Sequence, residues 1–524
     1  MIRSAVSLLR RILWLMTFLL ALAACDPGPE ADAVPPLIWN VHSAASPSNV
    51  LSAAVWFDTD EPAITSLALR SGDGHEITLS SGSVPSTGHR FSVWGLHAET
   101  LYRITVSATD SAGNTARKEL DAYRTPPLPR DIPPLQTLVS DPSRMQLGVT
   151  LFSVTRWTPA RDNNWGLLLA VDESGEVVWY HRTRAPVTDV RRLWGGNLRY
   201  LVGAHGAAEI DMLGNLVAVF QANELEPPVD SFHDEILQLP SGNFLTLSTE
   251  LRSLAGYQET SGSTSFDVVS DVLVEFTSGR QVVNRWSLFD VLDPLRVRLG
   301  FHLPYYNTMY KDKSQNPKDW SHANSIYFDP ADDSVLLSLM HQDWVIKTDR
   351  GTGEMRWRFG PEGDFELQGA GEWPYHQNAA RLLPNGNLIL FDSGTGRPGA
   401  QHFSEWTSRV VEYRLDTDNM TATQVWEFRG REPFYSEYNG EADLLPDGNV
   451  LITDGGRGKD PMLSYLHPEN LKFARILEVT HTDAPEVVFE LLVRDEEVGS
   501  VIRCIVASGC CVSIRSWRAE GIAL

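Results

Sequence analysis

The region from about residue 145 onward repeats two short strand patterns, and this repetition constrains the fold more than any other feature of the chain. Proline and glycine at fixed places favour a tight turn, because glycine adopts the positive φ that hairpin turns require. Each copy of the first pattern therefore predicts two antiparallel strands joined by a turn. The pattern is Leu-Pro-x-Gly-Asn and an apolar run, as in LPSGNFLTL (239–247), LPNGNLILF (383–391) and LPDGNVLIT (445–453), with weaker relatives at 194–202 and 329–339.

The second pattern is a strand, a turn, and a strand that ends in an aromatic or large apolar residue, and it occurs six times. Helical periodicity is almost absent, and intervals of 40 to 71 residues between copies suit four-stranded units with long insertions. We therefore predict an all-β fold in which residues 145–524 form a six-bladed β-propeller, whose closed ring protects the strand edges. The six terminal residues are Trp179, Val219, Trp286, Trp357, Trp426 and Phe489.

Residues 36–126 alternate apolar and polar side chains in the manner of short β-strands. Within 95–114 the alternation closes in an Asp/Ser/Gly/Asn turn, and Tyr102 resembles the tyrosine corner of a fibronectin type III strand. The pattern predicts a small fibronectin type III-like β-sandwich that positions the propeller and carries no chemistry. The proline-rich stretch TPPLPRDIPP predicts a stiff linker over 127–144.

The first 25 residues predict a lipoprotein signal peptide. Arg3, Arg10 and Arg11 precede an apolar run that is short for a membrane-spanning helix, and the run ends in Leu-Ala-Ala-Cys, which resembles a lipobox. We expect Cys25 to become the lipidated first residue of the mature protein, followed by a linker over 26–35, on the periplasmic side of the cell envelope. A plain signal peptide or an uncleaved anchor is the alternative.

Charge and cysteine content bound the partners and the compartment. The chain has 44 basic and 67 acidic side chains and a net charge of -23, which would repel nucleic acid but leaves room for a locally bound small anion. In an oxidising compartment Cys504 could pair with Cys510 or Cys511, and the sequence does not choose between them. The sequence also leaves the oligomeric state open.

Three histidines recur at nearly the same phase of the repeat. His322 and His376 each lie eight residues before the proline of their turn, and His233 lies seven before its proline. Equivalent positions in a propeller are related by rotation about the central axis, so we expect these imidazoles to converge on the axial channel. In the sixth blade Tyr438 or Asn439 holds this position. For any one histidine, the alternative is a loop or core residue satisfied by hydrogen bonds.

Four segments and the chain end resemble one family. They are DWSHANSI (319–326), LMHQDWVIKTD (339–349), WPYHQNAARLLPNGNLILFDSG (373–394), SRVVEYRLD (408–416) and the terminal WRAEGIAL. Together they are similar to the bacterial arylsulfate sulfotransferases, periplasmic six-bladed propellers that move a sulfuryl group from one phenol to another without a nucleotide cofactor. The resemblance implies an aryl sulfate and a phenol as substrates, and it implies neither a metal nor another cofactor.

The resemblance also implies roles for individual residues. His376 would be the nucleophile and form a sulfohistidine, while His322 and His233 would contact the sulfuryl oxygens and handle the phenolic proton. The family usually has an arginine directly before the histidine equivalent to His341, and this chain has a methionine there. The expected substrate-binding positions are His341, Asn324, Met340 and Arg397.

Arg397 and Arg457 follow strands that the repeat predicts to be the innermost of blades five and six. They are candidates for the channel, and the alternative is that both lie in surface loops. Two other functions stay open beside sulfuryl transfer. Three converging imidazoles could bind zinc with an open position, and a propeller with a sandwich could be a non-catalytic binding module, which the loss of the family arginine favours.

Overall fold

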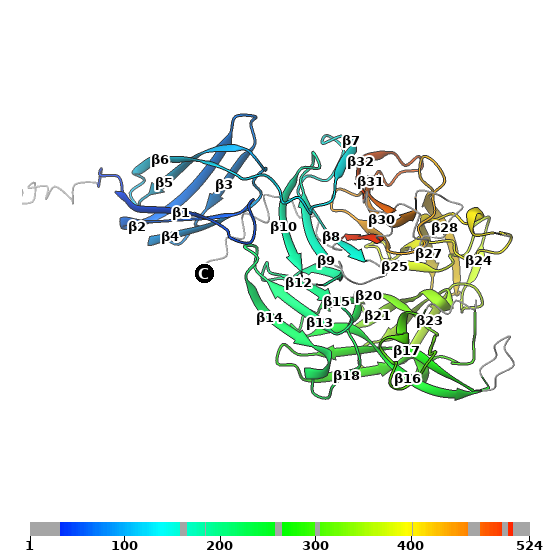
Figure 1. Ribbon diagram of the computed structural model, residues 1–524. Helices are drawn as coiled ribbons and strands as arrows, with labels where there is room; N and C mark the ends of the chain where they lie inside the picture. The colour runs from blue at the N-terminus through cyan, green and yellow to red at the C-terminus, as the bar shows by residue number, and fades with distance from the viewer. Residues whose placement is uncertain are drawn as a thin grey trace, which may run out of the picture.

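The computed structural model of the protein is built almost entirely of β-strands (Figure 1). The expected signal peptide, Cys25, Cys510 and Cys511 lie outside the residues it describes, as does the WRAEGIAL segment, while Cys504 lies on a strand whose side chains are not described. Among the described residues, no helix has the length and apolar character needed to cross a bilayer. The structure describes residues 32–157, 165–183, 185–256, 265–298, 304–400, 402–458, 472–494 and 501–506.

The N-terminal domain is the predicted β-sandwich. Its long strand β2 pairs with β1 and β4 through its first half and with β3 and β5 through its second half, so both sheets share it. The buried Tyr102 accepts a hydrogen bond from the backbone nitrogen of His97 at 2.9 Å, as expected of a tyrosine corner. The strands are β1 (Ile38–Ala45), β2 (Ala53–Ser71), β3 (Glu76–Ser80), β4 (Ser86–Val93), β5 (Leu101–Thr109) and β6 (Thr115–Arg124).

Six further sheets contain the rest of the strands, and we number them as blades in chain order. Blade 1 has β33 (Val501–Val506), β8 (Thr150–Trp157), β9 (Trp165–Val171) and β10 (Val177–Thr183); blade 2 has β11 (Val187–Arg192), β12 (Leu198–Val202), β13 (Gly206–Ile210) and β14 (Leu216–Gln221); blade 3 has β15 (His233–Gln238), β16 (Phe244–Ala255), β17 (Ser265–Phe276), β18 (Val282–Ser287) and the short β19 (Lys318–Asp319). Blade 4 has β20 (Ala323–Asp329), β21 (Ser334–Leu339), β22 (Trp344–Asp349) and β23 (Met355–Phe359); blade 5 has β25 (Gln377–Leu382), β26 (Leu388–Asp392), β27 (Arg409–Asp416), β28 (Thr421–Phe428) and β24 (Glu366–Gln368); blade 6 has β29 (Gly440–Leu444), β30 (Val450–Gly458), β31 (Lys472–Val479), β32 (Val487–Arg494) and β7 (Leu135–Ser140).

The innermost strands form a closed ring. Each of β11, β15, β20, β25 and β29 contacts the next, and β33 contacts both β29 and β11. Figure 1 shows the six sheets around this common centre, with the sandwich beside β10. The prediction of a six-bladed propeller is therefore confirmed. The six residues that end the second sequence pattern all lie on the fourth strand of their blades, and the Pro-x-Gly-Asn turns join the first strand to the second.

Two segments from opposite ends of the chain close the ring. The late strand β33 pairs with β8, so blade 1 combines early and late residues. The early strand β7 pairs with β32 at the outer edge of blade 6. The expected linker over 127–144 is therefore too long, since its second half is a strand of the propeller. A lone strand with no partner nearby in the sequence carries no repeat signal, which is why the sequence pattern missed it.

The propeller core lies between neighbouring blades. Leu245 of blade 3 packs in one cluster with Leu337 of blade 4, and Leu336 of blade 4 packs with Leu388 and Val411 of blade 5. These strands have apolar side chains on both faces, because each sheet is buried between its two neighbouring blades. The helical elements are short and lie in connections: η1 (Ala222–Glu224), α2 (Leu288–Val291), η2 (Pro304–Asn307), η3 (Met340–Gln342) and η4 (Phe403–Glu405).

The sandwich is packed on blade 1 and shares its hydrophobic core. The side chain of Asn49 donates to the carbonyl of Tyr180 at 2.7 Å, and the backbone of Gly95 donates to that of Val178 at 3.1 Å. Because blade 1 lies across the ring from blade 4, the sandwich is remote from the histidines of blades 4 and 5. Its described contacts support a positioning role.

Candidate active site

His322 and His376 occupy the same structural position in adjacent blades. Each lies directly before the innermost strand, and each has a positive φ, +48° and +50°. This left-handed conformation costs a non-glycine residue on the order of 1–3 kcal/mol and is concentrated at functional sites. Asn439 holds the matching position of blade 6 with φ +57°, whereas in blade 3 the strained residue is Asp234, directly after His233.

His341 joins His322 and His376 into a continuous row of imidazoles. It comes from η3, between the second and third strands of blade 4. Its ring centroid lies 4.7 Å from that of His322 and 5.8 Å from that of His376. His341 and His376 are 4% and 3% exposed, so these two rings are shielded from bulk water, while His322 is partly exposed. We call these three residues the histidine row.

Asp319 orients the blade 4 end of the row. Its carboxylate lies 2.5 Å from Nδ1 of His322, and its backbone carbonyl accepts a hydrogen bond from Nδ1 of His341 at 3.0 Å. Burial favours the neutral form of His322, but the Asp319 carboxylate outweighs burial and raises the pKa of His322 to about 9. His322 is therefore an imidazolium at neutral pH.

His341 has the opposite electrostatic character. Burial, together with the charge of His322, lowers the pKa of His341 to about 4, so its ring is neutral at pH 7. Because Nδ1 donates to a carbonyl, the lone pair lies on Nε2. That nitrogen is buried and has no hydrogen-bond partner within the part of the chain that the structure describes. The row thus presents a cationic and a neutral imidazole side by side.

His233 lies at the start of β15 in blade 3, and a carboxylate contacts each of its ring nitrogens. Its Nδ1 lies 2.7 Å from Asp234, and its Nε2 lies 3.1 Å from Asp271 and 3.3 Å from the carbonyl of Ser248. Burial lowers the pKa of His233, but the two carboxylates raise it to about 10. Asp271 also accepts from the backbone nitrogen of Ala323 at 2.5 Å. Both ring nitrogens of His233 therefore face protein acceptors, and Asp271 ties the His322 loop to blade 3.

His376 is held by Asp343, a residue from the neighbouring blade. One carboxylate oxygen of Asp343 accepts from the backbone nitrogen of His376 at 2.8 Å and lies 3.1 Å from its Nδ1. Asp343 is fully buried. Gln377, the next residue in the sequence, does not bond to this ring through its amide nitrogen, which donates to the carbonyl of Trp344 at 2.9 Å.

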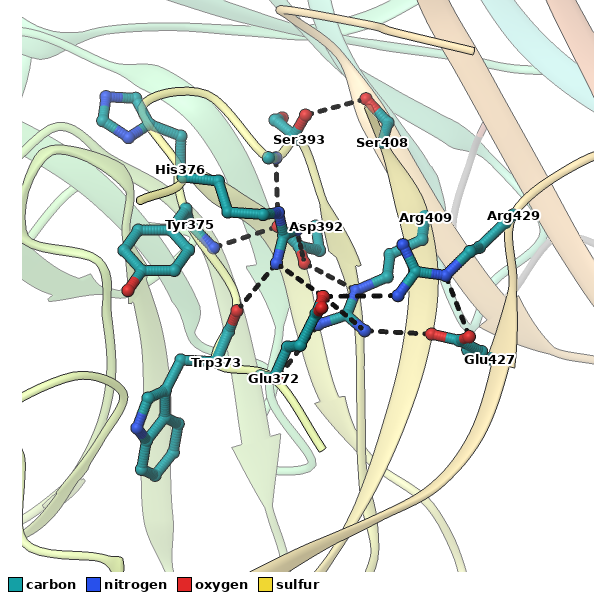
Figure 2. A network of polar contacts seen from close by, with 12 residues as sticks. Glu372, Trp373, Tyr375, His376, Asp392, Ser393, Ser408, Arg409, Glu427 and Arg429 are labelled. Carbon is teal, nitrogen blue, oxygen red and sulfur yellow. Dashed lines mark hydrogen bonds and ion pairs between the residues drawn. The ribbon is translucent and has the colours of Figure 1, made fainter. Parts of the chain in front are cut away.

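A network of ion pairs supports the other side of the His376 loop (Figure 2). Asp392 accepts from the backbone nitrogen of Tyr375 at 3.0 Å and from Nε of Arg409 at 2.8 Å. Arg397 pairs with the same carboxylate at 2.5 Å, and its guanidinium lies 5.6 Å from the Tyr375 ring centroid. Arg397 follows β26, the second strand of blade 5, so its expected place after the innermost strand was wrong. Arg457 likewise lies on a second strand, β30.

The remaining predicted residues lie near the row in supporting positions. Asn324 donates to the carbonyl of Gln377 at 2.9 Å and to the side chain of Asn378 at 2.6 Å, so its amide nitrogen joins blades 4 and 5. Met340 is 4% exposed, and its backbone nitrogen donates to the carbonyl of His322 at 3.0 Å. The loop before His341 therefore brings no cation of its own to the site.

A metal ion is the alternative occupant of the row. Asp319, His322 and His341 each have a ligand atom within 4.8 Å of the others, although Nδ1 of His322 is already bonded to the Asp319 carboxylate. Nδ1 of His341 donates to a carbonyl, an arrangement that metal-binding histidines share. Elemental analysis of protein purified without chelators tests this alternative.

The two raised pKa values predict a stability that falls at alkaline pH. His233 and His322 have folded pKa values of about 10 and about 9, above the ordinary 6.5. Their stabilisation is therefore complete below pH 6.5 and is lost as the pH rises through 9 and 10. We expect the free energy of unfolding to drop by a few kcal/mol over this window, since one pKa unit is worth about 1.4 kcal/mol.

Urea unfolding at pH 6.5 and at pH 10 measures this drop, and His233→Gln provides the control. The variant should be less stable at pH 6.5 and should lose less stability on the way to pH 10. A wild-type free energy that stays constant across the window would contradict the imidazolium assignment.

Comparison with known proteins adds a family likeness over both domains. A family model described as arylsulfotransferase (ASST) matches residues 137–499, and one described as the arylsulfotransferase Ig-like domain matches residues 40–125. The arylsulfate sulfotransferase AssT of Escherichia coli O6:H1 is 24% identical over an alignment of 382 residues, and the match covers 57% of this chain and 62% of that protein. The protein of the same name from Lelliottia amnigena is 24% identical over an alignment of 363 residues, and the match covers 54% of this chain and 58% of that protein.

The matched region thus spans less than two thirds of the length of either relative. Among solved structures, a luciferin-regenerating enzyme is 9% identical, with 70% of this chain and 97% of that chain covered at a TM-score of 0.37. A likeness at that distance carries no argument about function.

Proposed function

The chain belongs to the arylsulfotransferase family, and on this basis we propose that it moves a sulfuryl group from an aryl sulfate to a phenolic acceptor through a covalent intermediate on His376. The observation that carries the proposal is the histidine row. Each of its rings has Nδ1 next to a carboxylate or carbonyl, so that Nε2 is the nitrogen through which the ring meets substrate. In this arrangement His376 can act as the nucleophile and His322 as the acid, while His341 is their neutral neighbour.

The proposed reaction is a double displacement. Nε2 of His376 attacks the sulfur of the donor, the sulfur–oxygen ester bond breaks, and its electron pair leaves with the phenolic oxygen. His322 protonates that oxygen and becomes neutral. In the second half, the neutral His322 takes the proton of the acceptor phenol while the phenolic oxygen attacks the sulfur of the sulfohistidine. Splitting one hard transfer into two easier ones is the usual gain of covalent catalysis.

The charges of the site fit this chemistry. Sulfuryl transfer resembles phosphoryl transfer, in which the protein contributes mainly positioning and positive charge around the transferring oxygens. The His322 imidazolium supplies one such charge. His233, whose nitrogens both face protein acceptors, is assigned to hold Asp271, the carboxylate that accepts from the His322 loop, in contrast to the substrate-contacting role that the sequence implied.

We also propose that the protein is a lipoprotein of the cell envelope, anchored through Cys25. The support is the Leu-Ala-Ala-Cys sequence after a short apolar run. Mass spectrometry of the mature N-terminus tests it, and an unmodified or uncleaved terminus would contradict it.

Sulfuryl transfer is tested directly by comparing the wild type with Met340→Arg. With a chromogenic phenyl sulfate and a phenol acceptor, we expect turnover by both proteins. Met340→Arg should be faster by up to about 10²-fold, because a fixed guanidinium beside His341 would add an oxyanion donor. Absence of turnover and of a sulfuryl adduct in both folded proteins would overturn the proposal and favour the binding module.

A further inference from the structure

Asp343 is the fully buried carboxylate that links blade 4 to His376 of blade 5. It follows η3 directly, in the left-handed conformation with φ +52°. Burial raises the pKa of Asp343, but hydrogen bonds from His376 and Arg298 outweigh burial and lower it below the ordinary value, so the group is a carboxylate at neutral pH. An ionised carboxylate can only accept hydrogen bonds. Nδ1 of His376, 3.1 Å away, must therefore carry the proton of this contact.

Two arginines from another part of the chain hold the loop that bears Asp343. Both come from the connection after β18 of blade 3. Nε of Arg298 donates to the second carboxylate oxygen of Asp343 at 3.0 Å, and Nη1 of Arg296 donates to the carbonyl of Gln342 at 2.9 Å. The loop residue Met340 brings no charge, yet this connection places guanidinium groups against the same loop.

We propose that Asp343, held by Arg298, is the residue that fixes the Nδ1–H tautomer of His376 and so presents Nε2 as the nucleophile. This inference rests on the proposed function, because it assigns how the same site prepares its nucleophile. Asp343 and Arg298 act through His376, and both are therefore positioning residues.

The carboxylate also balances charge during the reaction. As the bond between Nε2 and sulfur forms, the electron pair of the breaking sulfur–oxygen bond leaves with the phenolic oxygen, and the imidazole ring becomes cationic because Nδ1 keeps its proton. Asp343 is in place to stabilise that cation. In the second half the phenolic oxygen of the acceptor bonds to sulfur, the bond between Nε2 and sulfur breaks, its electron pair returns to Nε2, and the ring is neutral again.

The tautomer itself is the first test and needs no substrate. We expect nitrogen NMR of the histidine-labelled wild type to show His376 protonated at Nδ1 and unprotonated at Nε2, with the resonances assigned by their loss in His376→Gln. A proton on Nε2 with a bare Nδ1 would overturn the inference.

Kinetics of the variants give the second test. We expect Arg298→Met and Asp343→Ala to lower kcat by about 10-fold and about 100-fold with little change in KM, as for other residues that orient a reacting ligand. Glu362→Gln is the matched control, because Glu362 is an exposed partner of Arg298 and should leave kcat unchanged. Should Asp343→Ala fail to fold, Arg298→Met carries the test, since Arg298 lies partly at the surface.

The outcomes separate this inference from the proposed function. Turnover with a sulfuryl adduct on His376, combined with wild-type kcat in the Arg298 and Asp343 variants, would overturn the positioning role alone. An inactive wild type whose His376 has the Nδ1–H tautomer would overturn the proposed function and leave the positioning role supported.

Discussion

Replacement of His376 by alanine is expected to lower kcat by on the order of 10⁴- to 10⁶-fold and to abolish the covalent sulfuryl adduct, as removal of a nucleophile does in other covalent enzymes. The residue stands at the end of the histidine row, and a carboxylate of the neighbouring blade holds both its backbone and its ring. Without the imidazole, the sulfuryl group would have to pass directly between two phenols. Single-turnover kinetics with mass spectrometry of the quenched protein measures both effects.

The matched control for this variant is His205→Ala. His205 is exposed on the connection after β12 and contacts the carbonyl of Asp230, so its loss should leave turnover unchanged. If His376→Ala kept a rate within about tenfold of the wild type, or if the adduct formed on another histidine, the assignment of the nucleophile would be wrong.

Replacement of His322 by glutamine is expected to lower kcat by about 10³-fold with phenyl sulfate and by much less with para-nitrophenyl sulfate. The reason is that a poor leaving group needs a proton from His322, whereas nitrophenolate leaves unaided. The variant keeps a hydrogen-bonding side chain beside Asp319 but has no proton to give. The dependence of the rate on leaving-group basicity distinguishes loss of an acid from a general disturbance of the site.

The pH profile checks the same assignment in the wild type. Because the pKa of His322 is raised to about 9, the imidazolium is present below that pH, and kcat should fall as the pH rises through it. The fall should be absent in His322→Gln. Equal losses for both leaving groups would show that His322 supports the structure and does not deliver the proton.

The propeller could be predicted because its signals are local. A Pro-x-Gly-Asn turn fixes its own hairpin, and six aromatic or large apolar residues mark the fourth strands of the blades. The strands β7 and β33 could not be predicted in this way, because each pairs with a strand far away in the sequence. Their places depend on ring closure, which leaves no periodic pattern in the residues themselves.

The site could be predicted only in part. Matching positions in the repeat indicated that His233, His322 and His376 converge on the axial channel, and the structure places His322 and His376 in one row with His341. Asp343 and Arg298 were missed. A carboxylate two residues after His341 was a signal for the first, whereas nothing in the sequence near Arg298 indicated that it would reach blade 4.

The sequence by itself determined the ring of blades and the equivalent positions of two histidines, because turn chemistry and rotational symmetry act through short stretches of chain. Only the tertiary structure decided the ionisation of His322 and of His341. His322 is charged and His341 is neutral although their rings lie 4.7 Å apart, since a carboxylate reaches Nδ1 of one and a backbone carbonyl reaches Nδ1 of the other. Burial and the nearest acceptor set a pKa, and both follow from how the loops of adjacent blades meet.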